Sequence, residues 1–568
     1  MDWVPAIVSR TVPSTANIIR GALVAYTTTK ILRWIWRSTF VRSTLYDLPG
    51  PPPQSWFKGN LGQLFSPKGL DFHQSLVDTY GGIVKVYGFF GDEQLYISDP
   101  KALHSITLKD QGAFEETSVF LETNKVIFGP GLVATKGEQH RRQRKMTAPI
   151  FGVAQLRQIV PTFYDIAEKL ADVLSNEVRG ERDKRQTLDM SAWMSRVALE
   201  SVGRTILGYS FDPLDSPHNN AYTSAVKDLI PTIFTLALVR QFAPFLVRLG
   251  PPWLRRKLVE WIPNDAVQKL KGMSDVMHGK AKEILELKYQ ELEDNPDAEN
   301  EAREGRLKDI ISALVKANES APEGERLSEN ELTGQMTVLI FGAQDTTSSA
   351  LSRILWQLSI RIDVQERIRK EAQECQRQSS AHRLSYEDIM ALPWLDAVIK
   401  ESLRLRYTRY PPVPFVRRVA TKDCIVPYTP EGHKGESSQV LIPSGTTLFV
   451  SIVGSNRLES VWGEDAKQWK PERWLSNEGP ERGKERLPGV YSGMMSFLGG
   501  QRSCVGHRFA QVEMKIILAT LLTRFKFSLT KDEIVWSLSQ IIAPSVKVNG
   551  PASTPVERRG LPLFVETL

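Results

Sequence analysis

Residues 497–506 read Phe497-Leu-Gly-Gly500-Gln-Arg502-Ser-Cys504-Val-Gly506 and carry the most specific pattern in the chain. An amphipathic helix follows at once, so Cys504 is expected at a helix entry, where backbone N–H groups and the helix dipole lower a thiol pKa. Glycine at 500 and 506 allows the backbone to approach a flat cofactor, because it has no Cβ. Phe497 would shield the sulfur from water, and Arg502 would meet an anionic carboxylate.

A single thiolate without a nearby second Cys or His is unsuited to structural zinc. It suits one axial bond to a haem iron. The alternative is a buried, inert cysteine, which is the usual state of a lone Cys. The five specified residues at fixed spacing favour the metal ligand.

Composition excludes several classes of protein. The chain has 568 residues, 41% of them hydrophobic, and 72 basic against 65 acidic residues give a net charge of +7. This charge is too dilute to indicate a nucleic-acid partner. Three cysteines, Cys375, Cys424 and Cys504, cannot form a disulfide framework and indicate a cytosol-facing protein. Length suggests about four domains, but residues 56–568 contain no linker, which favours one large domain.

The pattern of residues 497–506 resembles the haem loop F-x-x-G-x-R-x-C-x-G of the cytochrome P450 family of haem-thiolate monooxygenases. Glu401–Arg404 and Pro471–Trp474 resemble its E-x-x-R and P-E-R-F segments, in the family's order. The resemblance implies a mainly α fold with a small β-rich region (α+β, a triangular prism). It implies haem b with Cys504 as its axial thiolate, and a structural triad of Glu401, Arg404 and Arg473. E-x-x-R alone is more often a solvated surface pair.

A capped helix is expected to begin after Ser328, where Glu331 completes a capping box and Leu327 and Leu332 form a hydrophobic staple. It runs apolar into Gly342-Ala343-Gln-Asp345-Thr346-Thr347, whose acid and hydroxyls need partners if they are buried. This segment is similar to the family motif A/G-G-x-D/E-T-T/S and departs from it at Ala343. The resemblance implies that Asp345 and Thr346 deliver protons to bound oxygen. The alternative is a structural helix with an incidental Asp-Thr-Thr.

Residues 137–145 resemble the family's W-R-x-x-R-K helix, with His140 where tryptophan is commoner. The resemblance implies that three basic residues bind the haem propionates: His140, Arg144 and Arg418. It also implies that four residues of the haem loop contact the cofactor: Phe497, Gly500, Arg502 and Gly506. A basic, solvated helix face remains the alternative for Arg141, Arg142 and Lys145. Such exposed residues, with Arg508 and Lys515, would dock an acidic electron donor.

Substrate contacts are expected, by analogy with the family, in five regions: 114–132, 230–238, Ala343, 413–415 and 541–543. These regions are largely apolar, and the first contains Phe120, Val126, Ile127 and Phe128. They favour a hydrophobic, weakly hydrogen-bonding substrate such as a terpenoid, sterol or lipid-like molecule. The nearly uncharged residues 229–239 are either a buried core helix or an interfacial or substrate-access surface.

Residues 1–47 form a basic segment in which Asp2 is the only acid before Tyr46. The best spanning candidate, residues 11–29, contains Arg20, whose cost of about 3 kcal/mol cancels the apolar gain. Lys30, Arg33 and Arg37 share a face that suits an interfacial helix. A disordered leader or a mitochondrial transit peptide is the alternative. Residues 48–55 are proline-rich and form a hinge, and residues 56–568 are expected to form one haem-thiolate catalytic domain.

The expected function is therefore that of a microsomal monooxygenase, similar to fungal members that act in secondary metabolism. NADPH supplies electrons through a flavoprotein reductase, with cytochrome b5 as an additional donor. The expected location is the endoplasmic reticulum membrane with the catalytic domain in the cytosol; the mitochondrial inner membrane is the alternative. Two other functions remain: a haem-thiolate isomerase or dehydratase that needs no NADPH, and a non-catalytic haem-binding protein.

Overall fold

The computed structural model describes residue 28 and residues 43–179, 185–215, 221–294, 309–379, 382–405, 413–430, 437–475, 486–539, 541–549 and 555–568. Almost all of the expected N-terminal membrane segment, including Arg20 and the basic face of residues 30–37, lies outside the described residues. The expected hinge at residues 48–55 is described and contains no helix and no strand.

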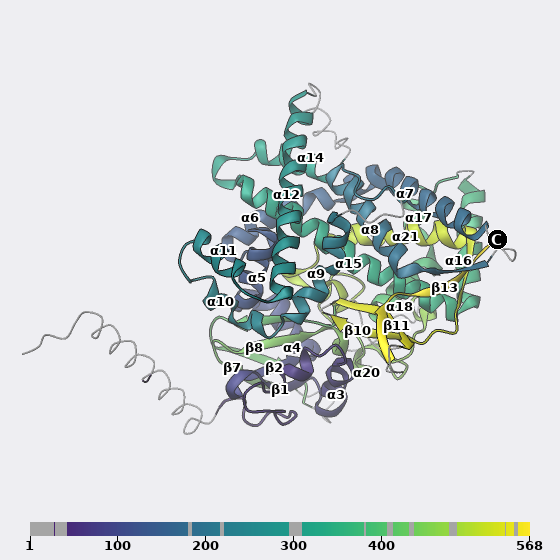
Figure 1. Cartoon of the computed structure of the whole chain (residues 1–568). Helices are drawn as coiled ribbons and strands as arrows, with labels where there is room; N and C mark the ends of the chain where they lie inside the picture. Colours follow the sequence, from purple (N-terminus) through teal and green to yellow (C-terminus); the bar gives the residue numbers. More distant parts are fainter. Residues whose placement is uncertain are drawn as a thin grey trace, which may run out of the picture.

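The described protein is mostly helical, as expected, and Figure 1 shows the helices gathered above and to the right of a smaller β-rich part. The longer helices are α3 (Leu70–Tyr80), α5 (Ser118–Phe128), α6 (Gly137–Thr147), α7 (Val153–Arg179), α8 (Met190–Val202), α9 (Ala221–Thr235), α11 (Pro252–Glu260), α12 (Asp265–Asp294), α14 (Ile310–Glu319), α15 (Glu329–Ile360), α16 (Ile362–Ser379), α18 (Pro393–Arg404) and α21 (His507–Arg524). The shorter ones are α2 (Leu61–Leu64), α4 (Pro100–His104), α10 (Ala243–Leu246), α17 (Tyr386–Ala391), α19 (Ile452–Ser455) and α20 (Glu459–Trp462).

The β-rich part is built on a five-stranded sheet of order β1-β2-β8-β5-β3. Its strands are β1 (Ile83–Tyr87), β2 (Glu93–Ile97), β8 (Thr447–Ser451), β5 (Phe415–Ala420) and β3 (Phe114–Glu115). The β2–β8 pairing is parallel, which brings residues near 96 beside residues near 449. Three smaller sheets are β10-β11-β12 (Ile534–Ser539, Ile541–Asn549, Pro555–Arg559), β4-β13-β9 (Arg185–Asp189, Pro562–Thr567, Phe525–Leu529) and β6-β7 (Cys424–Tyr428, Ser438–Ile442).

Helix α15 is the central element that positions the site. Its start is the expected capping box: Ser328 N–H donates to Glu331 Oε2 at 3.0 Å, and Glu331 N–H donates back to Ser328 Oγ at 3.4 Å. Most residues of α15 are buried, because α8, α12, β9 and β11 pack around it. Its interior position explains why apolar residues run all round it rather than along one stripe.

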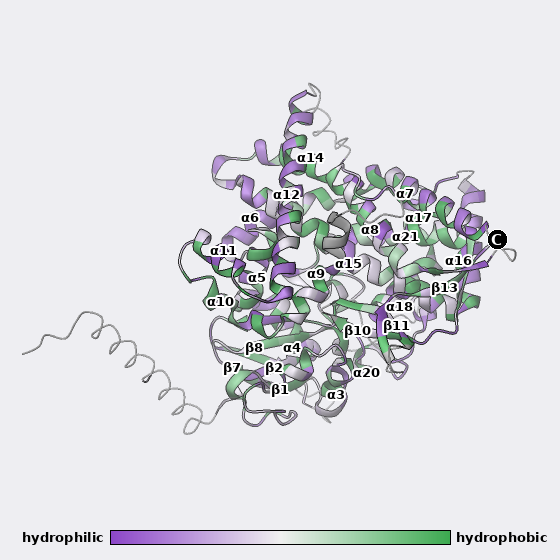
Figure 2. Ribbon diagram, in the orientation of Figure 1, coloured by the Kyte–Doolittle hydropathy of each residue, from purple (hydrophilic) through white to green (hydrophobic). Residues whose placement is uncertain are grey.

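A continuous cluster of buried apolar side chains runs from Leu45 to Val565 within the described residues. Figure 2 shows the matching distribution: hydrophobic ribbon is concentrated inside, and the free ends of the upper helices are hydrophilic. The uncharged residues 229–239 are largely core, with Leu229, Ile230 and Ile233 buried. No single described helix meets the length and hydropathy criterion for crossing a membrane, although the pair 228–235 and 239–246, bent by 72°, meets it jointly.

Candidate active site

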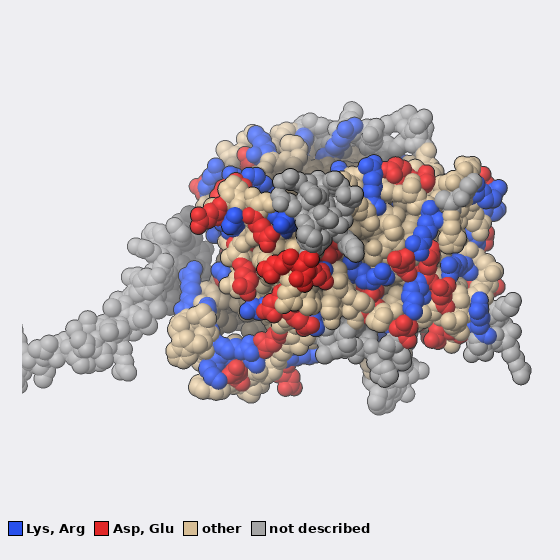
Figure 3. Space-filling view, turned by 90° about the horizontal axis from the view of Figure 1, so that it is seen from above, with Lys and Arg blue, Asp and Glu red and all other residues tan. Residues whose placement is uncertain are grey.

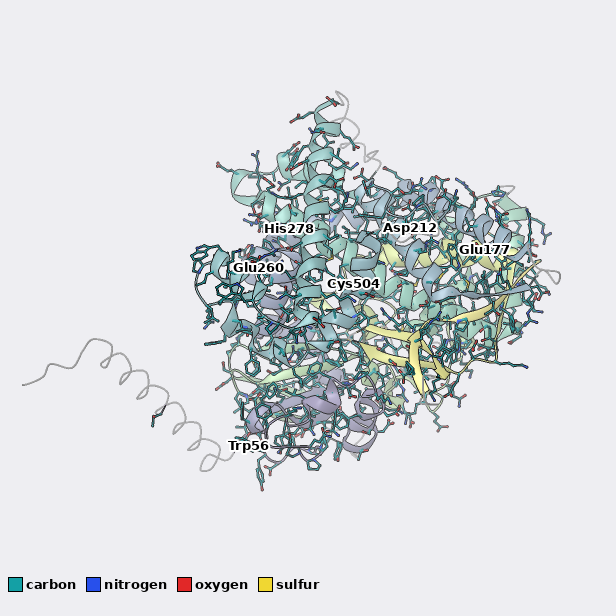
Figure 4. The ribbon with its side chains drawn as sticks, in the orientation of Figure 1. Trp56, Glu177, Asp212, Glu260, His278 and Cys504 are labelled. Atoms are coloured by element: carbon teal, nitrogen blue, oxygen red, sulfur yellow. The ribbon has the colours of Figure 1, made fainter. Side chains whose placement is uncertain are left out.

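A cavity of about 290 Å³ lies between α6, α15 and the loop that precedes α21. Helix α15 contributes one wall of the cavity, with Val338, Leu339, Gly342, Ala343 and Thr346. The loop contributes the opposite residues, Phe497, Leu498 and Arg502 to Gly506. Figure 4 places Cys504 in the middle of the molecule, far from the outer helix end marked by Glu260. The lining of the cavity is mostly apolar and contains one sulfur, that of Cys504.

Cys504 faces this cavity from the turn that leads into α21. Its backbone N–H donates to Phe497 O at 2.9 Å, which folds the loop back on itself. Burial raises the pKa of the Cys504 thiol, while the Gly506 N–H and the Arg144 charge lower it. The helix-entry effect expected from the sequence is thus present, but burial outweighs it in the protein alone.

The two loop glycines have different roles. Gly500 has a φ of +69°, and a Cβ there would lie 1.9 Å from Thr107 O. It is required for the close contact between the loop and residues 105–109, and it does not line the cavity. The loop presents this residue to its protein neighbour, so its expected contact with the cofactor stays a prediction. Gly506 lines the cavity, and its nearest obstacle to a Cβ is Phe151 at 3.9 Å.

One edge of the cavity is strongly basic. Arg144 donates to Ser503 O and Oγ at 2.8 and 2.9 Å, and Arg502 pairs with Glu115 at 3.0 Å. Arg418 lies behind this edge: it pairs at 2.6 Å with Glu116, which lines the cavity, and its charge acts on His140. These guanidinium groups place fixed positive charge where a flat group would carry its carboxylates.

His140 lines the same edge and is buried. Burial, with the charges of Arg502, Arg144 and Arg418, lowers the His140 pKa to about 3. The imidazole is therefore neutral at pH 7 in the protein alone. In the protein alone, burial and the neighbouring arginine charges keep His140 neutral, and its expected contact with a haem propionate stays a prediction.

The cavity fits haem on three observations. A lone cysteine sulfur faces mostly apolar walls, guanidinium groups gather at one edge, and Gly506 leaves the backbone uncovered beside the sulfur. Across the described ranges, no group of three or more His, Cys, Asp or Glu side chains is arranged to hold a metal ion. Cys504 would hold the iron, and the arginines would hold the carboxylates.

Asp345 and Thr346 are adjacent on α15 but face different spaces. Thr346 lines the large cavity, and its hydroxyl donates to Gly342 O at 2.8 Å. Asp345 is buried, with Oδ2 lacking a hydrogen-bond partner, and lines a separate small cavity. Burial raises the Asp345 pKa to about 7, and Arg559 lowers it only in part. The acid is thus suited to gaining and losing a proton near neutral pH.

The E-x-x-R pair forms a buried network that ends at the loop. Glu401 and Arg404 pair at 2.8 Å with both side chains fully buried, and Arg473 joins Glu401 at 3.1 Å. Arg404 also donates to Asn456 O at 3.0 Å, and Asn456 Oδ1 accepts from Met495 N–H at 2.8 Å. The network therefore connects α18 to the residues immediately before Phe497.

The sequence missed several contacts of this site. Trp474 donates its indole N–H to Glu401 Oε2 at 2.9 Å, so this departure from the family pattern adds a hydrogen bond. Arg142 is not part of a solvated face, because it pairs with buried Glu331 at 2.7 Å. Lys515 cannot dock a donor: it is fully buried and bonds Met390 O at 2.7 Å and Asp396 at 3.0 Å. Arg141, Lys145 and Arg508 are exposed as expected.

The expected substrate regions are only partly brought to the large cavity. In the first region Phe120 and Leu132 line it, whereas Ile127 and Phe128 belong to the core and Val126 faces solvent. Ala343 lines the large cavity. Residues 413–415 do not line it, but the next residue, Val416, does. Residues 230–238 are absent from its lining, and 541–543 contribute to the small cavity instead. Gln335, Val338 and Ile206 line the large cavity without any sequence signal having marked them.

Comparison with known proteins agrees with this site. Residues 49–548 match the family model for cytochrome P450. Cytochrome P450 monooxygenase 91 of Postia placenta is 41% identical over 93% of this chain and 96% of its own length. Cytochrome P450 monooxygenase 219 of the same fungus is 38% identical over 97% and 99%. A ganoderic acid synthetase of Ganoderma lucidum is 38% identical over 92% and 95%. The chain belongs to the cytochrome P450 family, whose α+β fold it adopts, and its relatives are oxidoreductases named as monooxygenases.

Proposed function

We propose that this protein is an NADPH-dependent monooxygenase that receives electrons from a flavoprotein reductase and oxidises a hydrophobic small molecule. The observation that carries the proposal is that Cys504 and Thr346 line the same mostly apolar cavity. When bound, haem supplies oxygen activation and substrate oxidation. The protein supplies the sulfur ligand, the anchoring charges, the proton donor and the exclusion of water.

Each of these contributions belongs to a particular residue. Cys504 presents the sulfur, and Arg144, Arg418 and Arg502 orient carboxylates at the basic edge. Thr346 holds a hydroxyl at the wall opposite the sulfur, and Asp345 holds a proton behind it. Phe120, Val338 and Leu339 contribute apolar side chains to the wall of the large cavity. A proton-delivering pair is needed for oxygenation but not for isomerisation or dehydration of a peroxide, which favours the monooxygenase.

A terpenoid, sterol or lipid-like substrate in fungal secondary metabolism is part of the proposal. The apolar side chains of the cavity wall support this class, because they offer little hydrogen bonding to a polar molecule. The name of one relative, a ganoderic acid synthetase, supports the terpenoid choice. The test is expression of the chain beside a fungal reductase, with metabolite profiling. Substrate loss that requires NADPH supports the proposal, and NADPH-independent conversion supports the isomerase or dehydratase.

Association with the endoplasmic reticulum membrane is also proposed. An aromatic patch supports it, formed by Trp56, Phe57, Phe89, Phe90 and Phe242. Its rings are in contact: Trp56–Phe90 and Phe57–Phe90 centroids lie 5.4 and 5.1 Å apart, and Phe89–Phe242 centroids 5.9 Å. Trp56 is 64% exposed and lies at the lower edge of the molecule in Figure 4. Exposed, clustered aromatic residues favour a lipid interface.

Cell fractionation tests the location. The full chain should sediment with endoplasmic reticulum markers, and replacing Trp56, Phe57 and Phe90 by serine should weaken its retention. Sedimentation with mitochondrial inner-membrane markers would contradict this location.

The docking of the reductase and of cytochrome b5 is proposed for exposed Arg141, Lys145 and Arg508. Figure 3 shows acidic and basic side chains interspersed on the upper face of the molecule, without one dominant charge.

A further inference from the structure

Two arginine side chains meet beside the five-stranded sheet, outside the lining of the large cavity. Arg417 belongs to β5, and Arg240 belongs to the short helical turn Val239–Phe242. Arg417 Nη1 donates to Gln241 Oε1 at 2.9 Å, so its side chain reaches the residue next to Arg240. Burial, together with the charge of Arg417, lowers the pKa of Arg240 to about 10. The two guanidinium groups are therefore close enough to repel each other.

Among the residues that the structure describes, no carboxylate forms an ion pair with Arg417. Burial lowers the pKa of Arg417 to about 10, and the charge of Glu116 opposes this effect only in part. Glu116 forms its own ion pair with Arg418, at 2.6 Å. A group with a pKa of about 10 is still charged at pH 7. Arg417 therefore adds positive charge beside Arg240 that no described side chain neutralises.

The arginine pair is accessible to a ligand. Both side chains are half-buried rather than sealed in the core. Within the described residues, the Arg417 side chain donates only the bond to Gln241, which leaves most of its N–H groups for a ligand. The Phe65 ring lies 5.4 Å from the Arg417 guanidinium carbon, and Phe65 contacts Phe415 with centroids 5.8 Å apart. The charge is thus placed against an aromatic wall.

The arginine pair is separated from the large cavity by one strand. Val416 lines that cavity, and Arg417, the next residue of β5, faces the opposite side. The edge of β5 that faces β3 is open along residues 415–418 of the described chain, because β3 pairs only with Val419 and Ala420. Glu116 lines the cavity, and its charge acts on Arg417. An anion at the arginine pair therefore lies across one open strand edge from the mostly apolar cavity.

We propose that Arg240 and Arg417 bind the carboxylate of the substrate, a hydrophobic acid whose apolar body extends across the edge of β5 into the large cavity. The inference rests on the proposed monooxygenase function and narrows its substrate class to molecules with one anionic end. A carboxylate between the two guanidinium groups replaces their repulsion by charge-assisted hydrogen bonds, which a neutral alcohol cannot match. The two arginines determine specificity without contacting the reacting atoms.

Equilibrium dialysis of the haem-loaded full chain, without NADPH, measures the preference for an acid. The probes are two pairs of compounds that differ only in the end group: dodecanoic acid with dodecan-1-ol, and dehydroabietic acid with dehydroabietinol. In wild type, the acid of at least one pair should bind about tenfold more tightly than its alcohol, or tighter still. Equal affinities within both pairs would overturn the proposal.

Substitution of the arginines tests which residues produce the preference. Arg417→Gln and Arg240→Gln should each reduce the acid preference about tenfold and leave the affinity for the alcohol within about twofold. Arg248→Gln is the matched control, because it removes the same charge from an exposed residue of the neighbouring segment. Arg417→Lys keeps the charge but not the planar fork, and should keep part of the preference.

Two outcomes of these substitutions would overturn the proposal. An unchanged acid preference in both glutamine variants would show that the arginines do not hold the carboxylate. An equal loss in Arg248→Gln would show an effect of net charge alone. Circular dichroism checks that each variant is folded, and the two glutamine variants test the site independently if one of them fails to fold.

A phospholipid headgroup offers the same anionic chemistry, so a second experiment separates it from a substrate. Sedimentation with phosphatidylcholine vesicles that contain or lack phosphatidylserine measures binding to an anionic lipid. If the glutamine variants lose affinity only for the phosphatidylserine vesicles and keep the acid preference, the arginines hold a lipid and the proposal fails.

Turnover separates this inference from the proposed function. With NADPH and reductase, Arg417→Gln should raise the KM of the acid about tenfold and change kcat little, because Arg417 does not line the cavity that contains Cys504. If wild type makes no product that depends on NADPH, the proposed function fails, while the dialysis measurements still judge the arginine site.

Discussion

Asp345 and Thr346 are consecutive residues of α15, yet the carboxyl lines the small cavity and the hydroxyl lines the cavity that contains the Cys504 sulfur. Successive residues of a helix point about 100° apart, so one turn of backbone presents a group to each side. The acid is therefore separated from the sulfur side by the helix itself. The acid that the proposed function uses as proton donor therefore lies outside the cavity that contains the sulfur.

The variant Asp345→Asn should lower NADPH-dependent product formation about 10- to 100-fold, because asparagine keeps the shape but cannot relay a proton. Burial raises the Asp345 pKa to about 7, so wild-type coupling should fall as pH rises through 7. Product per NADPH measured from pH 6 to 8 checks this. A pH dependence that persists in Asp345→Asn would show that another group carries the proton.

The same substitution lowers activity but should raise the free energy of unfolding. An acid whose pKa is raised on folding costs nothing below its unfolded value and destabilises the protein fully above its folded value. Asp345→Asn should therefore match wild type near pH 4 and exceed it at pH 8 by up to about 4 kcal/mol. Denaturant unfolding at the two pH values measures the difference. Equal unfolding free energies of the two proteins at pH 8 would contradict the burial of an ionised Asp345 carboxylate.

The Glu331 carboxylate should have the reverse effect on stability: it stabilises the fold at neutral pH, and this contribution is lost in acid. Its carboxylate accepts from Gln139, Gln143 and Arg142 at 2.9, 3.0 and 2.7 Å, and these bonds outweigh burial and lower its pKa to about 2. The stabilisation is present above the unfolded pKa and is lost as pH falls toward 2. Glu331→Gln should cost about 2 kcal/mol at pH 7 and much less near pH 2.5. Glu325 is the control: its carboxylate pairs with exposed Lys145 at 2.9 Å, and Glu325→Gln should cost under about 1 kcal/mol.

The two loop glycines provide a matched pair of alanine substitutions. Gly500→Ala forces a Cβ to 1.9 Å from Thr107 O at a φ of +69°, and should destabilise the fold by about 3 kcal/mol or more. Gly506→Ala meets no atom closer than 3.9 Å, and its unfolding free energy should stay within about 1 kcal/mol of wild type. Its effect should appear instead in haem absorption, because Gly506 lines the cavity. Reversed effects would contradict the assigned roles.

The sequence predicts best those features that depend on residues close together in the chain. The capping box at Ser328 and the turn before α21 depend on neighbours within a few residues, so spacing alone predicts them. The pairing of Trp474 with Glu401 and of Arg142 with Glu331 joins residues 73 and 189 positions apart, which no local pattern encodes. Lys515 was misjudged for a related reason: α21 is buried on nearly every side, so its lysine faces Asp396 rather than solvent.

The site was predictable in its chemistry but less so in its boundaries. The motifs placed Cys504, Arg144 and Thr346 on one cavity, because order and spacing were specific. Apolar composition could not tell cavity wall from core, so Ile127 and Phe128 were expected to meet substrate and instead pack inside. The small cavity was not foreseen, since it is made by Ser195, Asp345 and Arg559 from three distant elements.

The variant Trp474→Phe tests the added hydrogen bond to the triad. Phenylalanine restores the family residue but leaves Glu401 Oε2 without the indole donor, while Arg404 Nε still donates to it at 2.9 Å. The expected cost is about 1–3 kcal/mol of unfolding free energy, with no change in the haem spectrum. Arg404→Ala should cost far more unfolding free energy and should abolish haem retention, because it leaves the buried Glu401 carboxylate without its main ion-pair partner. An unchanged unfolding free energy in Trp474→Phe would show that this hydrogen bond does not stabilise the protein.

The carbon-monoxide difference spectrum of the reduced, haem-loaded protein tests the central claim, which is that Cys504 binds the iron as a thiolate. Wild type, Cys375→Ser and Cys424→Ser should all show the band at the position characteristic of a haem-thiolate. Cys504→Ser should lose that band while the variant remains folded, as judged by circular dichroism. Retention of the thiolate band in Cys504→Ser would contradict the account.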